Sequence, residues 1–356
     1  MTTSSNKNSK PRYCVIHEEL REPFDEGFKN IALSFVKHLG QISGVLGITR
    51  YGNDIPELNI KQISFNKLFL SFKLFNAINE FGPEVLFYIP YASITRNSFI
   101  RSKILQLFCR QKKTVMIAMQ PRKYNFIDKL IIKSLKSTVL CVQSRKSYDY
   151  FKKMKFNVKI LPSGVDLSRF KPVDKYEKNR LRKKYNIPED KYVVLHIGNL
   201  RKTRNLHILK QLTSMDNVHT VIVCSSSVDP DLSFARQLES DSLTLISDYV
   251  EKVQEMYQLA DCYVFPVTNP QAAAQFPLSV LEAMAVNLPV AATPYGGLVE
   301  TFDQDVDFAF FEGIDDLKPA IERFMSVESN NRQKVIKFSW ANVINNVLEE
   351  IADLKL

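Results

Sequence analysis

A single acidic residue, Glu282, stands inside an otherwise apolar and small-residue stretch, QFPLSVLEAMAVNLPVAATPYGG, which covers residues 275–297. The turn FPLS is predicted to open a helix whose first amides lack intrahelical partners and are suited to receive a phosphate. Glu282 lies one turn further in, where its carboxylate is placed to accept hydrogen bonds from the two hydroxyls of a ribose. The alternative is that Glu282 is only a good helix former, but unpaired acids are rare in such an apolar helix. The ligand-contacting residues predicted in this stretch are Phe276, Pro277, Leu278, Ser279 and Glu282.

A short basic loop follows the strand predicted at HIGNL. Gly198 closes this strand, and Arg201, Lys202 and Arg204 come directly after it. Cations at the carboxyl end of a strand, before the start of a helix, suit a diphosphate. An ordinary solvated loop explains the same residues, so the loop alone does not decide between the two interpretations.

Two series of alternating strands and helices position these residues. In the first half, a strand is predicted at 12–20 and a helix at 25–40, with acids in its first turn and Gly40 at its end. Apolar residues at three-to-four spacing predict another helix at 64–82. A second series starts near residue 191, after a charged connector. Such alternation predicts an α/β fold of two doubly wound, Rossmann-like domains that face each other across a cleft, with ligands at the carboxyl ends of the strands.

The chain has 356 residues, which exceeds the usual size of one compact core and favours two domains. Residues 1–10 are predicted to be a disordered tail, residues 11–163 an N-terminal domain and residues 164–335 a C-terminal domain. Residues 336–356 are predicted to be an amphipathic helix that packs across the domain junction.

The net charge of +10 is concentrated in one segment, residues 101–159. This segment contains 16 lysines and arginines against two acids, Asp128 and Asp149, so it carries +14 and the rest of the chain −4. A local basic field attracts an anionic lipid surface, a nucleic acid or a phosphorylated substrate, unless it is only a solvated lysine-rich face. No nucleic-acid recognition pattern is visible, so a nucleic-acid partner is not expected.

Composition also bears on location. No run of about 20 apolar residues is present, and the polar start does not resemble a signal peptide. The five cysteines are widely spaced, and no pair has the spacing of metal ligands, so we expect reduced, buried thiols. These features predict a cytoplasmic protein, with peripheral association at the inner face of the membrane as an additional hypothesis.

Four separated segments resemble, in order, the signatures of retaining glycosyltransferases of family 4, also described as glycosyl transferases group 1, which have the GT-B fold. They are LPSGVDLSRFKP, VLHIGNLRKTRNL, FPLSVLEAMAVNLPVAATPYGGLVE and FSWANV. In the N-terminal half, PFDEGFKN resembles the glycine-containing first loop of that family. The resemblance implies transfer of a sugar from a nucleotide-sugar donor, without a metal ion or other cofactor and with retention at the anomeric carbon. The nucleotide would bind the C-terminal domain and the acceptor the N-terminal domain.

The resemblance also implies roles for individual residues. Glu282 matches the acid that holds the ribose, and Arg204 matches the lysine that meets the diphosphate. Gly27 matches the loop glycine that lets the backbone approach the donor phosphates. Backbone phosphate contacts are implied for Leu278 and Ser279, and a place beside the base is implied for Tyr249 and Val250.

Three positions depart from the family pattern. Ala274 stands where the first acid of a glutamate pair is usual, Asn199 where an arginine is usual, and Gln120 where a histidine is usual. Losing a cation at a buried diphosphate costs several kcal/mol of transition-state stabilisation, by analogy with removal of an oxyanion donor. Candidates to replace the cation are Arg201, Lys202 and Arg122.

The residues assigned to catalysis are Arg204, Gln120 and His17, the last because it closes the first strand and is predicted to reach an acceptor. His196, inside a strand, is predicted to be a core residue. The main hypothesis is an active, hexosyltransferase-like enzyme acting on a glycan or lipid-linked acceptor in cell-envelope polysaccharide or glycolipid assembly. The alternative is a catalytically impaired relative that acts as a binding or regulatory subunit.

Overall fold

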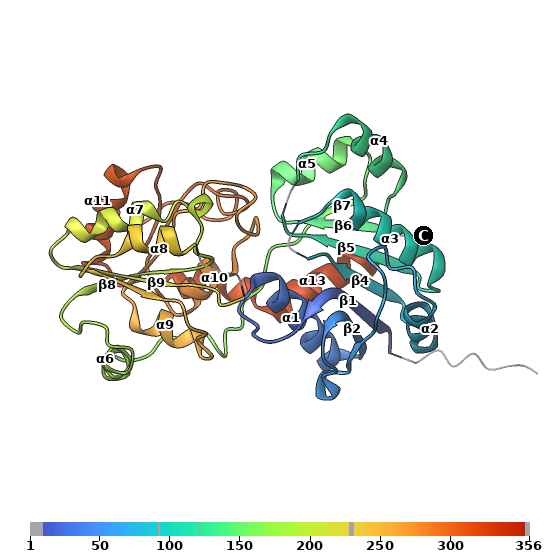
Figure 1. The fold of residues 1–356 in the computed structure, drawn as a ribbon, viewed down its shortest axis with the longest axis horizontal. Helices are drawn as coiled ribbons and strands as arrows, with labels where there is room; N and C mark the ends of the chain where they lie inside the picture. The colour runs from blue at the N-terminus through green and yellow to red at the C-terminus, as the bar shows by residue number, and fades with distance from the viewer. Residues whose placement is uncertain (1–9, 92, 121, 228–230, 353–356) are drawn as a thin grey trace, which may run out of the picture.

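The computed structural model describes residues 10–91, 93–120, 122–227 and 231–352. The tail predicted at residues 1–10 therefore lies outside the described residues, apart from Lys10. Figure 1 shows two α/β halves side by side, each built on its own sheet. We call the half with the seven-stranded sheet the N-terminal domain and the half with the six-stranded sheet the C-terminal domain.

The N-terminal sheet is parallel, with strand order β3-β2-β1-β4-β5-β6-β7. Its strands are β1 (Arg12–Leu20), β2 (Gly44–Gly52), β3 (Ile60–Gln62), β4 (Val85–Ile89), β5 (Lys113–Ala118), β6 (Val139–Val142) and β7 (Val158–Ile160). Its helices are α1 (Gly27–Ile42), the short 3-10 turn η1 (Pro56–Leu58), α2 (Phe72–Phe81), α3 (Arg96–Phe108), α4 (Phe126–Ser134) and α5 (Arg145–Lys153).

The C-terminal sheet is also parallel, with strand order β10-β9-β8-β11-β12-β13. Its strands are β8 (Tyr192–Ile197), β9 (Val218–Val223), β10 (Leu243–Ile246), β11 (Cys262–Phe265), β12 (Val290–Ala292) and β13 (Phe308–Phe310). The helices along this part of the chain are α6 (Lys175–Lys184), α7 (His207–Lys210), α8 (Leu232–Leu238), α9 (Val253–Leu259), α10 (Leu278–Ala285), α11 (Ile314–Phe324), α12 (Asn331–Val335) and α13 (Trp340–Ala352). Three 3-10 turns complete it: η2 (Lys202–Arg204), η3 (Gln211–Ser214) and η4 (Ile336–Phe338).

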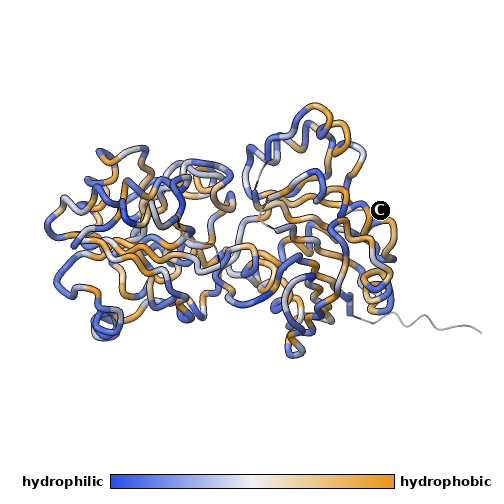
Figure 2. The backbone as a smooth tube through the Cα atoms, in the orientation of Figure 1, coloured by the Kyte–Doolittle hydropathy of each residue, from blue (hydrophilic) through white to orange (hydrophobic). Residues whose placement is uncertain are grey.

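Each sheet separates two hydrophobic clusters because successive side chains of a strand point to opposite faces. In β1, Val15 joins the cluster formed with α1 and α13, whereas its neighbours Cys14 and Ile16 join the cluster formed with α2 to α5. Figure 2 shows hydrophobic segments along the strands in the middle of each half. This two-sided burial explains why the strands read as nearly continuous apolar runs.

The helix predicted at 64–82 is wrong over its first part, because α2 begins only at Phe72. Phe69 has a left-handed backbone with φ of 66°, which interrupts any helix at that point. The side chains of Phe65 and Phe69 are nevertheless buried, with ring centroids 4.7 Å apart. The apolar spacing therefore identified some core residues but not the backbone that carries them, and two residues of the same pattern, Leu68 and Phe72, are 37% and 87% exposed.

Two other details of the prediction need correction. Helix α1 runs two residues past Gly40, and its first turn contains no acid, because Asp25 and Glu26 precede the helix. Strand β3 and helices α8 and α11 were not predicted. Strand β3 and helix α8 are short, with three and seven residues, whereas α11 has 11 residues and an amphipathic pattern that was overlooked.

All five cysteines are buried and free of disulfides. Within the described ranges, no helix is long and apolar enough to cross a membrane.

The domain junction is formed by two crossings of the chain that lie against each other. The amide of Val165 donates to the carbonyl of Phe338 at 2.8 Å, and the amide of Trp340 donates to the carbonyl of Val165 at 3.3 Å. A Cβ atom at Gly164 would lie 2.4 Å from Cδ2 of the Trp340 ring. The ring itself packs edge-on against Phe35 of α1. Helix α13 therefore completes the N-terminal core although it is encoded at the end of the chain.

We expect the substitution Gly164→Ala to destabilise the protein by about 1–3 kcal/mol, because overpacking forces the Trp340 ring or the backbone to move. The measurement is the melting temperature followed by circular dichroism. The control is Gly313→Ala, since no atom lies within 4 Å of an added Cβ there. Equal melting temperatures for the two variants would contradict this account of the junction.

Candidate functional site

The amino end of α10 faces the cleft-side loops at the carboxyl edge of the C-terminal sheet. Pro277 is the N-cap residue, and the helix begins at Leu278, as the sequence predicts. Among the hydrogen bonds of the described residues outside helices and strands, none uses the amides of Leu278 or Ser279. The first amides of a helix have no intrahelical acceptor, so these groups are available to an anion.

Glu282 is half-buried in α10 and is held by a tyrosine. The hydroxyl of Tyr257, a fully buried residue of α9, donates to Glu282 Oε2 at 2.7 Å. Burial raises the pKa of Glu282 above its ordinary value of 4.5, although the bond from Tyr257 and the charge of Arg169 oppose this shift. The role of Tyr257 was not predicted from the sequence, because a tyrosine in an apolar helix is expected to be only a core residue.

Arg204 lies on the C-terminal domain beside the bare backbone of Gly198. A Cβ at position 198 would lie only 2.2 Å from Nη1 of Arg204, so a side chain there would force the guanidinium to move from its observed position. The Nε of Arg204 is shielded from solvent and has no hydrogen-bond partner, and no carboxylate in the described part of the chain forms an ion pair with this residue. Burial and the charge of Arg201 lower the pKa of Arg204. The site therefore holds a cation without an anion of its own.

His196 lies next to this cation and is buried, as predicted for a core residue. Its Nδ1 lies 2.9 Å from the carbonyl of Val264, while its Nε2 is buried without a partner. Burial and the charge of Arg204 lower the pKa of His196 to about 3, so the ring is neutral at physiological pH. A donor proton on Nδ1 leaves an unused lone pair on Nε2 beside Arg204.

The other basic-loop residues are more open. Arg201 and Lys202 are exposed, and Asn199 is half-buried at the end of β8. Tyr249 is exposed, and Val250 is half-buried, beyond the end of β10. Burial, then the charges of Asp25 and Glu22, raise the pKa of Tyr249, which places its phenol near the loop that precedes α1.

Ala274 and Phe276 belong to the packing between the domains. Ala274 is half-buried and packs against the N-terminal cluster that contains Val15 and Phe35. Phe276 is buried, with its ring centroid 5.5 Å from that of Phe338. Its amide donates to the side chain of Gln143, and its carbonyl accepts from Ser163 at 2.7 Å, so all groups of Phe276 are engaged within the protein.

The N-terminal domain places three predicted residues around the same cleft. Gly27, at the start of α1, lies against Leu278, whose Cδ1 would be 3.5 Å from an added Cβ. Gln120 is half-buried just after β5, and its carbonyl accepts from the amide of Ile94. His17 is 0% exposed and lies 2.7 Å from the carbonyl of Ile89 through Nδ1, beneath the rings of Phe28 and Tyr91. An acceptor therefore reaches His17 only if those rings move.

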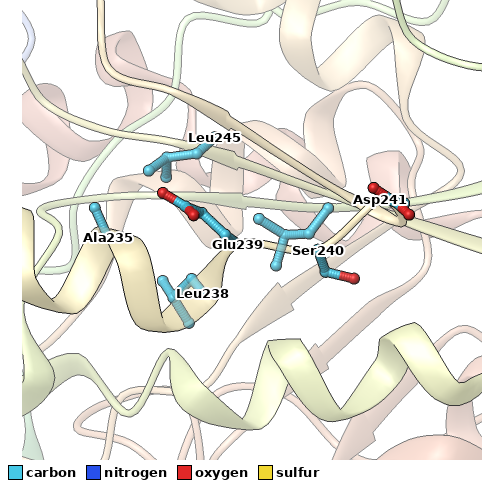
Figure 3. A pocket seen from close by; sticks show the side chains of 7 residues that line it. Ala235, Leu238, Glu239, Ser240, Asp241 and Leu245 are labelled. Carbon is cyan, nitrogen blue, oxygen red and sulfur yellow. The ribbon is translucent and has the colours of Figure 1, made fainter.

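A cavity of about 570 Å³ lies elsewhere, between α8 and the edge strand β10, and Figure 3 shows the side chains that line it. None of its lining residues is a predicted site residue, and Glu239 and Asp241 make it acidic. An acidic lining repels a diphosphate, so we place the candidate site at α10 instead. In the described residues, no group of three or more potential ligands is placed to hold a metal ion.

We expect Arg204→Met to raise the stability of the ligand-free protein by about 1 kcal/mol, because it removes a buried donor that has no acceptor. The measurement is thermal unfolding of the two proteins without ligand. Arg201→Met is the matched control, because this exposed neighbour should change stability by less than about 0.5 kcal/mol. A destabilised Arg204→Met protein would show that the guanidinium has a structural partner.

Comparisons with known proteins give relatives for part of the chain. A D-inositol 3-phosphate glycosyltransferase of Geodermatophilus obscurus is 26% identical over 230 residues, which cover 58% of this chain and 49% of that protein. A processive diacylglycerol beta-glucosyltransferase of Bacillus subtilis is 26% identical over 152 residues, which cover 40% of this chain and 37% of that protein. The chain thus spans about half or less of the length of these curated relatives.

Solved structures match almost the whole chain. HepE of Anabaena, crystallised with UDP, has a TM-score of 0.77 at 13% identity and covers 96% of this chain and 100% of its own. Sucrose-phosphate synthase of Thermosynechococcus elongatus has a TM-score of 0.74 at 15% identity, with 96% and 98% covered. These likenesses confirm the predicted fold, GT-B, with two Rossmann-like domains. Residues 177–339 match the family described as Glycosyl transferases group 1, so this chain carries a glycosyl transferases group 1 domain within a GT-B fold.

Proposed function

We propose that this protein is a retaining, metal-independent glycosyltransferase that takes its sugar from a nucleotide-sugar donor. Three observations carry the proposal: the cation of Arg204, which has no carboxylate partner among the described residues, the unused amides at the start of α10, and the carboxylate of Glu282. The names of the relatives support the transfer of a sugar, and the UDP bound to HepE supports a nucleotide-sugar donor.

In this proposal the donor diphosphate lies between Arg204 and the amides of Leu278 and Ser279, where a guanidinium and a helix N-terminus both favour negative charge. Glu282 accepts hydrogen bonds from the ribose hydroxyls, and the bond from Tyr257 fixes its orientation. Gly27 lets the N-terminal loop approach the phosphates without a side chain in the way. Tyr249 and Val250 border the base.

The proposed reaction breaks the bond between the anomeric carbon and the donor phosphate oxygen. The acceptor hydroxyl forms the new bond on the same face, and its proton passes to the leaving phosphate oxygen. Arg204, with Arg201 or Lys202, stabilises the charge that develops on the leaving group. Gln120 lies on the acceptor side of the cleft.

One observation favours a second candidate function, a catalytically impaired relative that binds or regulates an active partner. Ala274 replaces the first acid of the family pattern, and it packs against apolar residues of the other domain. Purified protein incubated with UDP-, GDP- and ADP-sugars separates the two. Turnover of one donor above the level of Glu282→Ala supports the enzyme, whereas binding without turnover supports the impaired relative.

We expect Glu282→Gln to weaken binding of the matching nucleoside diphosphate by about tenfold, because hydrogen bonds to a charged acceptor are stronger than neutral ones. In the wild type, affinity should fall as pH drops through the pKa of Glu282, which is above 4.5, because protonation removes an acceptor. Titration calorimetry between pH 8 and pH 5 measures both effects. A Glu282→Gln protein that keeps the pH dependence of the wild type would contradict the assignment.

We further propose that the acceptor is a glycan or a lipid-linked glycan and that the protein works in the cytoplasm, against the inner face of an anionic membrane. At the start of α4, Phe126, Ile127 and Leu130 are 75%, 64% and 53% exposed. Lys129 and Lys133 lie on the same helix and line a groove of about 270 Å³ with Phe126 and Leu130. Exposed apolar side chains ringed by lysines suit insertion among anionic headgroups.

The triple substitution Phe126→Ser, Ile127→Ser and Leu130→Ser should reduce sedimentation with phosphatidylglycerol vesicles about tenfold, because it removes the apolar part of membrane binding. The control is Val299→Ser with Val306→Ser, which removes exposed apolar side chains from the C-terminal domain. Unchanged sedimentation of the triple variant would argue against α4 as the membrane contact.

A further inference from the structure

Asp25 joins the two domains across the cleft. It lies in the loop between β1 and α1, and its carboxylate reaches the loop that follows β9 of the C-terminal domain. Oδ2 accepts from the amides of Ser226 and Ser227 at 2.7 and 3.0 Å. The hydroxyls of Ser225 and Ser226 donate to Oδ2 at 3.1 and 2.9 Å, and the hydroxyl of Ser227 donates to Oδ1. We call Asp25 with Ser225–Ser227 the Asp25 clasp.

The contacts of the clasp are those of a bound anion. An ionised carboxylate can only accept hydrogen bonds. Here its two oxygens accept from backbone amides, which can only donate, and from serine hydroxyls, which can donate as well as accept. Burial raises the pKa of Asp25, but the bonds from Ser227 and Ser226 outweigh it and leave the pKa below 3.8. Asp25 is therefore ionised at neutral pH, and its bonds are of the strong, charge-assisted kind.

A buried lysine supports the clasp from the N-terminal side. Lys29 of α1 is only 2% exposed, and its Nζ lies 3.4 Å from the hydroxyl of Ser227 and 3.3 Å from the carbonyl of Pro23. The same Nζ lies 3.7 Å from Glu19 and 3.8 Å from Glu26. Lys29 therefore fixes the loop around Asp25 while it also touches the C-terminal domain.

The clasp is separate from the contacts at the domain junction. There, the hydroxyls of Ser144 and Ser147 donate to the Gln275 side chain at 2.9 and 2.7 Å, and Gln143 is bonded to Ser163, next to Gly164. Gln275 follows β11, whereas the clasp serines follow β9, and β8 lies between these two strands. The clasp thus closes the cleft at a second point of the sheet edge, away from the crossings of the chain.

The loop that carries Asp25 is the loop that covers the candidate donor site. Two residues after Asp25, Gly27 lies against Leu278 at the start of α10. Tyr249, predicted to lie beside the base, is close enough to Asp25 for its pKa to be raised by that charge, after burial. Release of the clasp would allow the loop to leave both the phosphate end and the base end of the site.

We propose that Asp25 is a positioning residue whose clasp on Ser225–Ser227 holds the two domains closed over the site at α10. Its effect on catalysis rests on the proposed glycosyltransferase function, but its effect on closure does not. A closed cleft excludes water, so loss of the clasp should favour hydrolysis of the donor over transfer to the acceptor.

Domain closure can be measured directly because all five native cysteines are buried. Dyes are attached through Glu57→Cys in the N-terminal domain and Gln237→Cys in the C-terminal domain, both at exposed positions. The distance distribution between the dyes is then recorded for four forms of the full chain. One keeps Asp25, two carry Asp25→Ala or Asp25→Glu, and the fourth carries both Ser226→Ala and Ser227→Ala. Glu22→Gln, in the same loop, is the control that removes an equal charge.

Asp25→Ala should raise the ratio of open to closed molecules about tenfold, in line with the loss of hydrogen bonds to a charged group. The serine double variant should open less, since both amides remain, and Asp25→Glu should restore part of the closure. The ratio of donor hydrolysis to transfer should rise in the same order. Thermal unfolding of each variant shows whether it is folded.

A distance distribution for folded Asp25→Ala that equals that of the wild type would overturn the proposal, whatever its activity. Opening by Asp25→Ala, with no donor turned over by either protein, would uphold the clasp and reject the proposed function instead. Opening by Glu22→Gln to the same extent would also overturn the proposal, because any loss of charge in the loop would then suffice.

Discussion

The unpaired charge of Arg204 is the constraint around which the C-terminal half is arranged. A guanidinium in this position needs space beside the backbone, and the absence of a side chain at Gly198 provides it. It also needs neighbours that do not neutralise it, and His196 meets this condition because burial and the charge itself keep its ring neutral. A carboxylate in this place would stabilise the ligand-free protein and would compete with an incoming phosphate. Under the proposed function, the retained charge sacrifices stability for binding, as functional sites commonly do.

A similar situation holds for Glu282, one turn into α10. Burial raises the pKa of Glu282, and its carboxylate accepts a hydrogen bond from Tyr257 of a neighbouring helix. The cation and the carboxylate do not pair with each other in the described structure, so each keeps its bonding capacity. A ligand that is anionic at one end and rich in hydroxyls at the other would satisfy both residues, which is why we propose a nucleoside diphosphate rather than a simple phosphate.

Much of this arrangement was predictable from sequence, but only where the information is local. Strand β1 was predicted with its observed bounds, because residues 13–16 form a short apolar run at its centre. The start of α10 was predicted from the turn before it. The helix over 64–82 failed because Phe65 and Phe69 reach the core from an irregular segment, which periodicity cannot distinguish from a helix. Tyr257 and the partners of Asp25 were missed because these contacts join residues that are 25 and about 200 positions apart.

The departure at Ala274 and the Asp25 clasp belong to one rearrangement of the cleft. Ala274 packs against the same N-terminal cluster as Phe24, which precedes Asp25 in the loop, and Phe28, which lies in the first turn of α1. An acid at position 274 would have to lie against this apolar surface, where an unpaired carboxylate is costly. The N-terminal cluster thus meets Ala274 with apolar side chains, whereas Asp25 of the nearby loop carries its carboxylate to the serines after β9. An acid introduced at position 274 alone would therefore need a polar partner that this apolar cluster does not supply.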